Sequence, residues 1–138
     1  MKLNTRIRYG LRAILEIALD ETDNGVFQKD ISERQDISVK YLDNIITALK
    51  TAGLVINARG KKSGYKLTRK PGKIKIIDVY NAFTPGVVVI DCLIDKHVCD
   101  RSSRCKVRDF WGGLNDTIIK YLESYTLEDL IKEHRRKA

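Results

Sequence analysis

Helix-spaced apolar residues alternate with short turns in the first half of the chain. In residues 5–20, apolar side chains recur every three or four positions, which predicts an amphipathic helix; they are Ile7, Leu11, Ile14, Leu15 and Ala18. Turn residues (TDNGVF) follow at 22–27. A short helix over 28–35 and a longer one over 38–52, with Ser38 as its N-cap, are predicted next. Two helices joined by a tight turn are typical of a helix-turn-helix motif.

A β-hairpin is predicted directly after that motif. Residues 54–57 and 65–68 have the apolar pattern of short strands, and the glycine-bounded loop ARGKKSG lies between them at 58–64. A hairpin with a basic tip in this position is a wing. It contacts the flanking backbone or the minor groove of DNA, while the second helix lies in the major groove.

The second half of the chain carries more apolar surface than a small domain can bury. Residues 74–83 predict a further helix, and 87–90 fit either a strand or a buried extended link. A long helix over 106–124 has a broad apolar stripe, for which a second copy of the chain is the simplest cover. We therefore expect a homodimer. Thr126 and Asp129 form a capping box for a last helix.

Composition and charge narrow the class of protein. Hydrophobic residues make up 43% of the chain and charged residues 32%, the balance of a folded globular protein. The sequence shows no signal peptide and no membrane span, and its odd number of cysteines argues against a disulfide framework. We therefore expect a cytoplasmic protein with no membrane partner. The net charge of +8 favours a polyanionic partner.

Several exposed polar positions are candidates for contact with double-stranded DNA. On the helix over 38–52, serine, lysine, tyrosine and asparagine side chains escape the apolar face, and such groups bond phosphates and base edges. A solvated polar helix face explains any one of these residues equally well. The prediction of DNA binding therefore rests on the helix-turn-helix motif followed by a basic wing. The candidates are Arg6, Arg8, Gln28, Ser38, Lys40, Tyr41, Asn44, Arg59, Lys61, Lys62 and Ser63.

The three cysteines, Cys92, Cys99 and Cys105, lie within fourteen consecutive residues. Thiolates are soft ligands, and these spacings let one loop wrap an iron-sulfur cluster. Neighbouring basic residues and the start of the long helix favour the thiolate form. The same cluster of cysteines is also compatible with free thiols that bind no ligand, with a redox switch in which two thiols form a disulfide, and with a zinc site completed by His97.

The order of these features resembles the IscR, NsrR and RirA family of bacterial winged-helix transcription regulators. MKLNTRIRYGLRAILEIAL is similar to the family's opening helix, ISVKYLDNIITALKTAGLV to its recognition helix, and ARGKKSGYKL to its wing. The cysteine segment, the aromatic-rich helix after it and TLEDL complete the resemblance. It implies a homodimer on a palindromic operator and a cluster that senses iron, nitric oxide or redox state. It also implies that the three cysteines are cluster ligands.

The fourth cluster ligand departs from the family pattern. IscR-like members have a histidine three residues after the last cysteine, where this chain has Arg108. NsrR-like members have an aspartate in the first helix, where it has Arg8. The first gap between cysteines is also one residue longer than in typical IscR. The sequence is compatible with both a 2Fe-2S and a 4Fe-4S cluster. The candidate fourth ligands are an exogenous thiol or water, His97, Asp91, Asp109 and Asp95.

We expect a mainly α fold with a small β-hairpin wing, made of a winged helix-turn-helix head and a long dimerisation helix. The expected division is a DNA-binding domain over 1–85, a cysteine-bearing sensor loop over 86–105, and a dimerisation helix with a C-terminal helix over 106–138. The expected function is cluster-controlled regulation of transcription, mostly repression. Catalysis is not expected, because the sequence shows no nucleophile-and-base pair. A metal-free or zinc-binding thiol redox regulator and a small iron-sulfur electron carrier are the alternatives.

Overall fold

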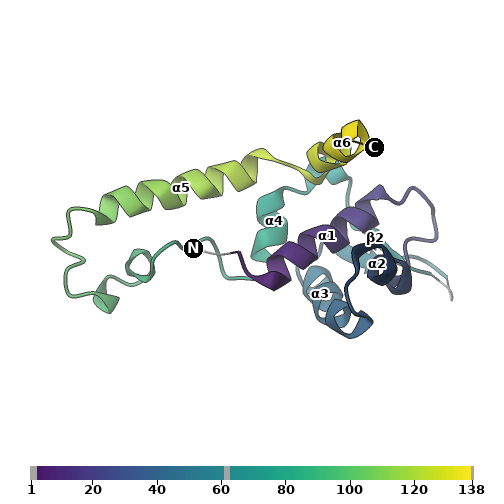
Figure 1. The fold of residues 1–138 in the computed structure, drawn as a ribbon, viewed down its shortest axis with the longest axis horizontal. Helices are drawn as coiled ribbons and strands as arrows, with labels where there is room; N and C mark the ends of the chain where they lie inside the picture. The colour runs from purple at the N-terminus through teal and green to yellow at the C-terminus, as the bar shows by residue number, and fades with distance from the viewer. Residues whose placement is uncertain (1–2, 61–62, 138) are drawn as a thin grey trace.

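A helical head and one long projecting helix make up the computed structural model, which describes residues 3–60 and 63–137 (Figure 1). The helices are α1 (Thr5–Leu19), α2 (Gln28–Gln35), α3 (Val39–Thr51), α4 (Ile76–Asn81), α5 (Arg108–Ser124) and α6 (Leu127–Lys137). The strands β1 (Val55–Asn57) and β2 (Tyr65–Leu67) pair antiparallel. Short 3-10 turns are η1 (Pro71–Lys73), η2 (Asp91–Leu93) and η3 (Lys96–Val98). The predicted mainly α fold with a small hairpin is confirmed. None of the helices among the described residues is both long and apolar enough to cross a membrane.

The core of the head forms around α1. This helix contacts α2, α3, α4, α6 and β2, and α5 alone among the helices extends away from the head (Figure 1). Full burial of an aliphatic side chain stabilises a fold by roughly 1.5–3 kcal/mol, so this shared face holds the head together. Its buried members are Ile7, Gly10, Ala13, Ile14 and Ile17. The core cluster that includes its aliphatic members also contains Ile31, Leu42, Ile45, Ile46, Leu49 and Leu127 from other helices.

Side-chain caps fix where two of the helices begin. The Tyr41 backbone N–H donates to Ser38 Oγ at 3.1 Å, which confirms the predicted N-cap of α3. The Asp129 N–H donates to Thr126 Oγ1 at 3.2 Å, and the Thr126 N–H donates to Asp129 Oδ2 at 2.9 Å. This reciprocal pair confirms the predicted capping box of α6. Asp36, at a φ of 54°, ends α2 in the left-handed region and makes the tight turn to α3.

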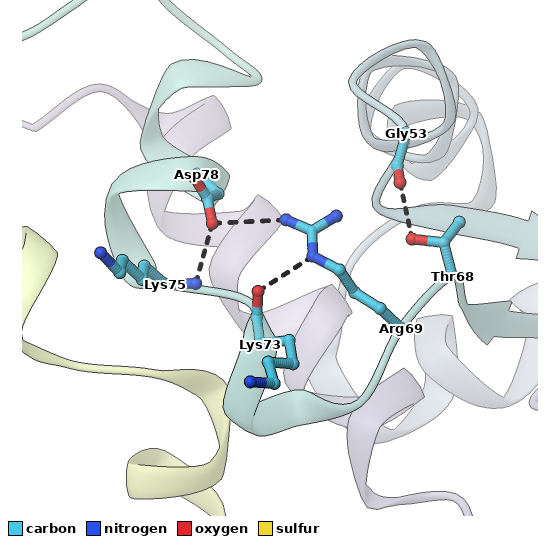
Figure 2. Close-up of polar contacts among 6 residues, drawn as sticks. All are labelled: Gly53, Thr68, Arg69, Lys73, Lys75 and Asp78. Carbon is cyan, nitrogen blue, oxygen red and sulfur yellow. Dashed lines mark hydrogen bonds and ion pairs between the residues drawn. The ribbon is translucent and has the colours of Figure 1, made fainter.

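The wing hairpin is joined to α4 by hydrogen bonds around Arg69 (Figure 2). Arg69 Nε donates to the carbonyl oxygen of Lys73 at 2.9 Å, and its Nη2 lies 3.4 Å from Asp78 Oδ2. The same Asp78 oxygen accepts from the Lys75 backbone N–H at 2.9 Å, just before α4. Thr68 Oγ1 donates at 2.6 Å to the carbonyl oxygen of the glycine that follows α3. The exit of the hairpin is therefore held to both α3 and α4.

The helix predicted over 74–83 is shorter in the structure. It spans only Ile76–Asn81, because the residues before it are extended and pair with the segment that precedes α6. The Leu127 N–H donates to the Ile74 carbonyl at 3.0 Å, and the Ile76 N–H donates to the Tyr125 carbonyl at 2.9 Å. These hydrogen bonds attach the segment between α5 and α6 to the segment that precedes α4.

Residues 87–90 form an extended link and not a strand. The Val89 N–H donates to Asn115 Oδ1 at 2.8 Å, and Asn115 Nδ2 donates to the Val87 carbonyl at 2.9 Å. One side-chain amide from α5 thus satisfies two backbone groups that a neighbouring strand would otherwise pair. The helix predicted from residue 106 begins at Arg108, so two residues separate Cys105 from α5.

Gly10 marks the closest approach of α1 to the segment after α4. A Cβ at this position would lie 2.2 Å from Phe83 Cε2. We therefore expect Gly10→Ala to lower the free energy of unfolding by about 1–3 kcal/mol through overpacking, although alanine is favoured over glycine in a helix. Urea unfolding of Gly10→Ala, Phe83→Leu and the double variant tests this. The double variant should lose less stability than the sum of the single ones; additive losses would contradict a steric clash between these two positions.

Candidate nucleic-acid interface and cysteine pocket

The outer face of α3 presents the polar residues predicted to read DNA. Ser38, Lys40 and Asn44 are exposed, and Tyr41 is half-buried. The Tyr41 ring packs edge-on against Tyr9 of α1, with 5.6 Å between the ring centroids. This contact fixes the N-terminal end of α3 against α1, so the exposed side chains next to it extend from a rigid base.

Two cations on α1 each lie beside an aromatic ring. The Arg6 guanidinium lies 5.5 Å from the Phe83 ring centroid, and that of Arg8 lies 5.8 Å from the Tyr9 centroid. Both arginines are exposed. Because Tyr9 also packs on Tyr41, Arg8 lies next to the start of α3, where a phosphate backbone would pass if α3 entered the major groove.

Arg12 is a residue that the sequence reasoning missed. Its Nε donates to Gln35 Oε1 at 2.9 Å, its Nη2 donates to the Gln35 carbonyl oxygen, and its guanidinium lies 5.0 Å from the Tyr9 centroid. Arg12 therefore holds the end of α2 against α1 and fixes the turn before α3. Its spacing of four residues from Arg8 places both on one helix face, which is the pattern that could have identified it.

Gln28 is engaged within the protein. Its Nε2 donates to the Val39 carbonyl at 2.9 Å and to Asp43 Oδ1 at 2.7 Å, and its Oε1 accepts from the Tyr65 hydroxyl at 3.3 Å. The side chain thus links α2 to α3 and to β2. Its geometry suits a residue that positions α3 against the hairpin, and its contact with DNA stays a prediction.

Two of the candidate DNA-contacting residues lie in the described part of the wing loop, and they differ in exposure. Arg59 is exposed, whereas Ser63 is half-buried and its Oγ donates to the Ala58 carbonyl at 2.5 Å. Lys61 and Lys62, also predicted to contact DNA, lie outside the described residues. The structure therefore presents at least one cation, Arg59, on the hairpin that follows α3.

The three cysteines line one pocket of about 260 Å³ beside the start of α5. Cys92 is buried, Cys105 is half-buried and Cys99 is exposed, and all three are free thiols. The hydrophobic wall around them consists of Ile90, Val98, Val107 and Trp111. The loop before α5 thus brings three soft donors to a single hollow with an apolar wall.

Arg108 supplies a positive charge to the wall of this pocket. Its Nη2 and Nε donate to the carbonyl oxygen of Cys92 at 2.9 and 3.3 Å. The guanidinium therefore holds η2 against the first turn of α5. An arginine has no acceptor and stays charged, so at this position it attracts an anionic group and does not ligate a metal.

The candidate fourth ligands lie in different places. Asp91 lines the cysteine pocket, whereas His97 lines a separate polar hollow that also includes Cys99. Asp109 is exposed on the first turn of α5, and Asp95 Oδ1 accepts from the His97 N–H at 2.9 Å. Within residues 3–60 and 63–137, no three His, Cys, Asp or Glu side chains are assembled around a single metal ion. The zinc set completed by His97 is therefore not preformed.

The type of donor in this pocket suits an iron-sulfur cluster, which takes thiolate ligands. A cluster takes one thiolate on each of several iron atoms, so its ligands surround a volume rather than a point. Three thiols that line one pocket with an apolar wall and one cation match that requirement in donor type. Asp91 is the candidate fourth ligand that shares the pocket.

The apolar stripe of α5 is exposed. None of the residues of this helix, all of which are described, is buried, and Phe110 and Tyr121 are 68% and 62% exposed. Trp111 lines the cysteine pocket and packs edge-on against Phe110, with 5.2 Å between centroids. The pocket and the exposed stripe therefore share the first turns of α5.

Comparison with known proteins gives one consistent family. The family model Rrf2, described as an iron-dependent transcriptional regulator, matches residues 3–133. The protein named Protein rrf2 from Nitratidesulfovibrio vulgaris is 37% identical to this chain, over 96% of this chain and 89% of the relative. The HTH-type transcriptional regulator IscR of Xenorhabdus nematophila is 36% identical, over 96% of this chain and 80% of the relative.

Solved structures of similar proteins have the same fold over nearly the whole chain. CymR, described as the global cysteine regulator of B. subtilis, is 28% identical with a TM-score of 0.79, over 96% of this chain and 98% of CymR. IscR of T. potens is 32% identical with a TM-score of 0.74, over 97% of this chain and 88% of that IscR. The similarity therefore extends beyond the head to the cysteine segment and α5.

The three thiols should differ in their rates of alkylation in the folded protein. Cys99 is exposed, whereas Cys92 is buried behind a backbone that Arg108 holds in place. We expect iodoacetamide to label Cys99 first, Cys105 next and Cys92 last, because reagent access limits the reaction. Mass spectrometry of reduced, metal-free protein gives the order, and the chain unfolded in urea is the control in which the rates converge. Equal labelling of Cys92 and Cys99 in the folded protein would contradict this pocket geometry.

Proposed function

The chain belongs to the Rrf2 family of transcriptional regulators, and from this premise we propose that it is a homodimeric repressor controlled by an iron-sulfur cluster at Cys92, Cys99 and Cys105. It is a DNA-binding regulator and not an enzyme, since its relatives are named as transcriptional regulators. The proposed control by an iron-sulfur cluster rests on one observation: the three thiols line a single pocket against the first turn of α5.

DNA binding would use α3, the wing and α1 together. The exposed Lys40 and Asn44 suit base edges and phosphates in the major groove, and Arg59 on the hairpin suits the flanking backbone. In a symmetric dimer, the two α3 helices would lie one DNA turn apart, roughly 34 Å, and the operator would be palindromic. The net charge of +8 per chain supports binding to such a polyanion.

Dimerisation would cover the stripe on α5. Exposed aromatic residues of this size are costly in water, and Phe110, Leu114 and Tyr121 are all more than 40% exposed in the single chain. A second α5 offers the same apolar surface and so matches it. The pocket would then lie beside the dimer interface, because Trp111 borders both.

The cysteine pocket would hold the cluster through its three thiolates. When bound, the cluster supplies a centre that responds to iron supply and redox state. The Arg108 guanidinium would attract the anionic cluster while it keeps its bonds to the Cys92 carbonyl. The apolar wall around Trp111 would limit access of water to the thiolates.

A continuous set of contacts connects the pocket with the DNA-reading head. The turn η2 contacts α5, α5 contacts α4, and α4 contacts α1. Arg69 then joins the region of α4 to the exit of the hairpin (Figure 2). Occupancy of the pocket would bias two packing states of α5 and so change the spacing of the α3 helices, without altering any residue that contacts DNA.

A thiol-based regulator without metal is the second candidate function. The similarity to CymR, which is described as a global cysteine regulator, favours it. The presence of three free thiols in one pocket also suits a switch in which two of them form a disulfide and a cellular oxidant takes up the two electrons and two protons. Metal content separates the two candidates, because this switch needs no iron.

Cluster loading should change operator affinity. We expect anaerobically reconstituted protein to differ from the metal-free protein by roughly 5- to 150-fold in operator affinity, the usual range of coupling between two sites. Cys92→Ser should remove a ligand and abolish the difference. Iron analysis, absorption spectra and DNA-binding titrations measure these quantities. Iron-loaded and iron-free proteins of equal affinity would refute the sensor role, and a protein that takes up no iron but responds to a disulfide-forming oxidant would establish the second candidate.

Substitutions on α3 should separate phosphate contact from base reading. Lys40→Ala, if it removes one phosphate contact, should reduce the slope of log affinity against log salt by about 0.9. Asn44→Ala should weaken operator binding by about 1–3 kcal/mol and leave binding to random DNA nearly unchanged. Lys132→Ala, an exposed lysine on α6, is the matched control for charge. Equal effects of Lys40→Ala and Lys132→Ala would argue against α3 as the recognition helix.

A further inference from the structure

Ser102 has a buried hydroxyl group that lacks a hydrogen-bond partner. The residue is 8% exposed, and its Oγ is the only fully buried side-chain N or O atom without a partner among the described residues. A hydroxyl can donate one hydrogen bond and accept two. Burial without any of these bonds costs free energy, so a partner that binds in the pocket would relieve a penalty that the free protein carries.

Ser102 is one of the residues that line the cysteine pocket. Ser102 lines this pocket together with Cys92, Cys99 and Cys105. Its backbone N–H donates to the carbonyl oxygen of Cys99 at 3.1 Å, so the backbone of Ser102 is fixed relative to one of the thiols. The cationic donor of the pocket, Arg108, already donates to the Cys92 carbonyl. The Ser102 hydroxyl is therefore an unused donor on a residue that lines the same pocket as the three cysteines.

We propose that Ser102 is a positioning residue of the sensor site, whose hydroxyl donates a hydrogen bond to an anionic sulfur, either of a ligating cysteine or of the cluster itself. The inference rests on the proposed function, because it needs a cluster in the pocket. Hydrogen bonds to sulfur stabilise the negative charge that a bound cluster brings and make its reduction easier. Ser102 would thus set how firmly the cluster is held and how readily it is reduced.

The neighbouring serine provides a contrast. Ser103 is exposed and lines the separate polar hollow with Lys96 and His97. Ser103 has the same hydroxyl group as Ser102 and lies in the same loop, but it does not line the cysteine pocket. Ser103→Ala is therefore a matched control for Ser102→Ala, because any general loosening of the loop should affect both variants.

The test compares cluster loss in anaerobically reconstituted wild-type protein, Ser102→Ala and Ser103→Ala. With a ferrous chelator present, we expect iron release from Ser102→Ala to be about 10-fold faster than from the wild type, the lower end of the usual effect of lost partners around metal ligands. The reduction potential of its cluster should also be more negative. Ser103→Ala should match the wild type in both measurements, and the absorption bands of all three should agree because the ligands are unchanged.

Thermal unfolding of the metal-free proteins separates a sensor role from a structural one. In the metal-free state the hydroxyl has no bond to lose, so Ser102→Ala should unfold at the same temperature as the wild type or higher. A lower unfolding temperature would show that the hydroxyl supports the loop itself and would overturn the proposal.

Each remaining outcome has a distinct meaning. A wild-type protein that takes up no iron refutes the proposed function, and this inference falls with it. A wild type that binds a cluster, with Ser102→Ala equal to it in release rate and potential, overturns only the role of Ser102. Altered absorption bands in Ser102→Ala would identify the serine oxygen as a cluster ligand, which also contradicts its assignment as a donor.

Discussion

Burial of the apolar face of α1 is the interaction on which the head depends. A helix of 15 residues packs against four other helices and a strand, so each of these elements is positioned through it. The close approach at Gly10 brings the segment after α4 against the same helix that holds α3. The relative placement of α3 and α4 is thus determined by one shared surface, so α3, the proposed recognition helix, is packed as part of the head.

The long helix α5 is governed by different forces. It has no buried residue in the single chain, and its contacts are with α4, with η2 and with the link at 87–89. Under the proposed function, its position would depend on what covers its apolar stripe and on what fills the cysteine pocket. A packed head and an exposed helix would then suit a dimer whose output is the distance between its two heads.

Periodicity and capping chemistry predicted much of the fold, and contacts distant along the chain determine the rest. The spacing of aliphatic residues identified α1 and α3, and the pair Thr126 and Asp129 identified the start of α6, because these signals are local. The bonds from Asn115 join residues 26 and 28 positions apart, and no local pattern reveals them. The clustered cysteines indicated a common site, but neither the bond from Arg108 to the Cys92 carbonyl nor the unpaired Ser102 hydroxyl has a signature in the sequence.

The Asn115 amide has a consequence for how gradual a response could be. It binds the backbone on both sides of Val88, just before the cysteine loop, to the middle of α5. A shift of α5 along its axis must either carry this strip of chain with it or break both bonds together, at a cost of about 1 kcal/mol for each. In the proposed switch, these two bonds would oppose small displacements of α5, because both must break together before the helix can move relative to the link.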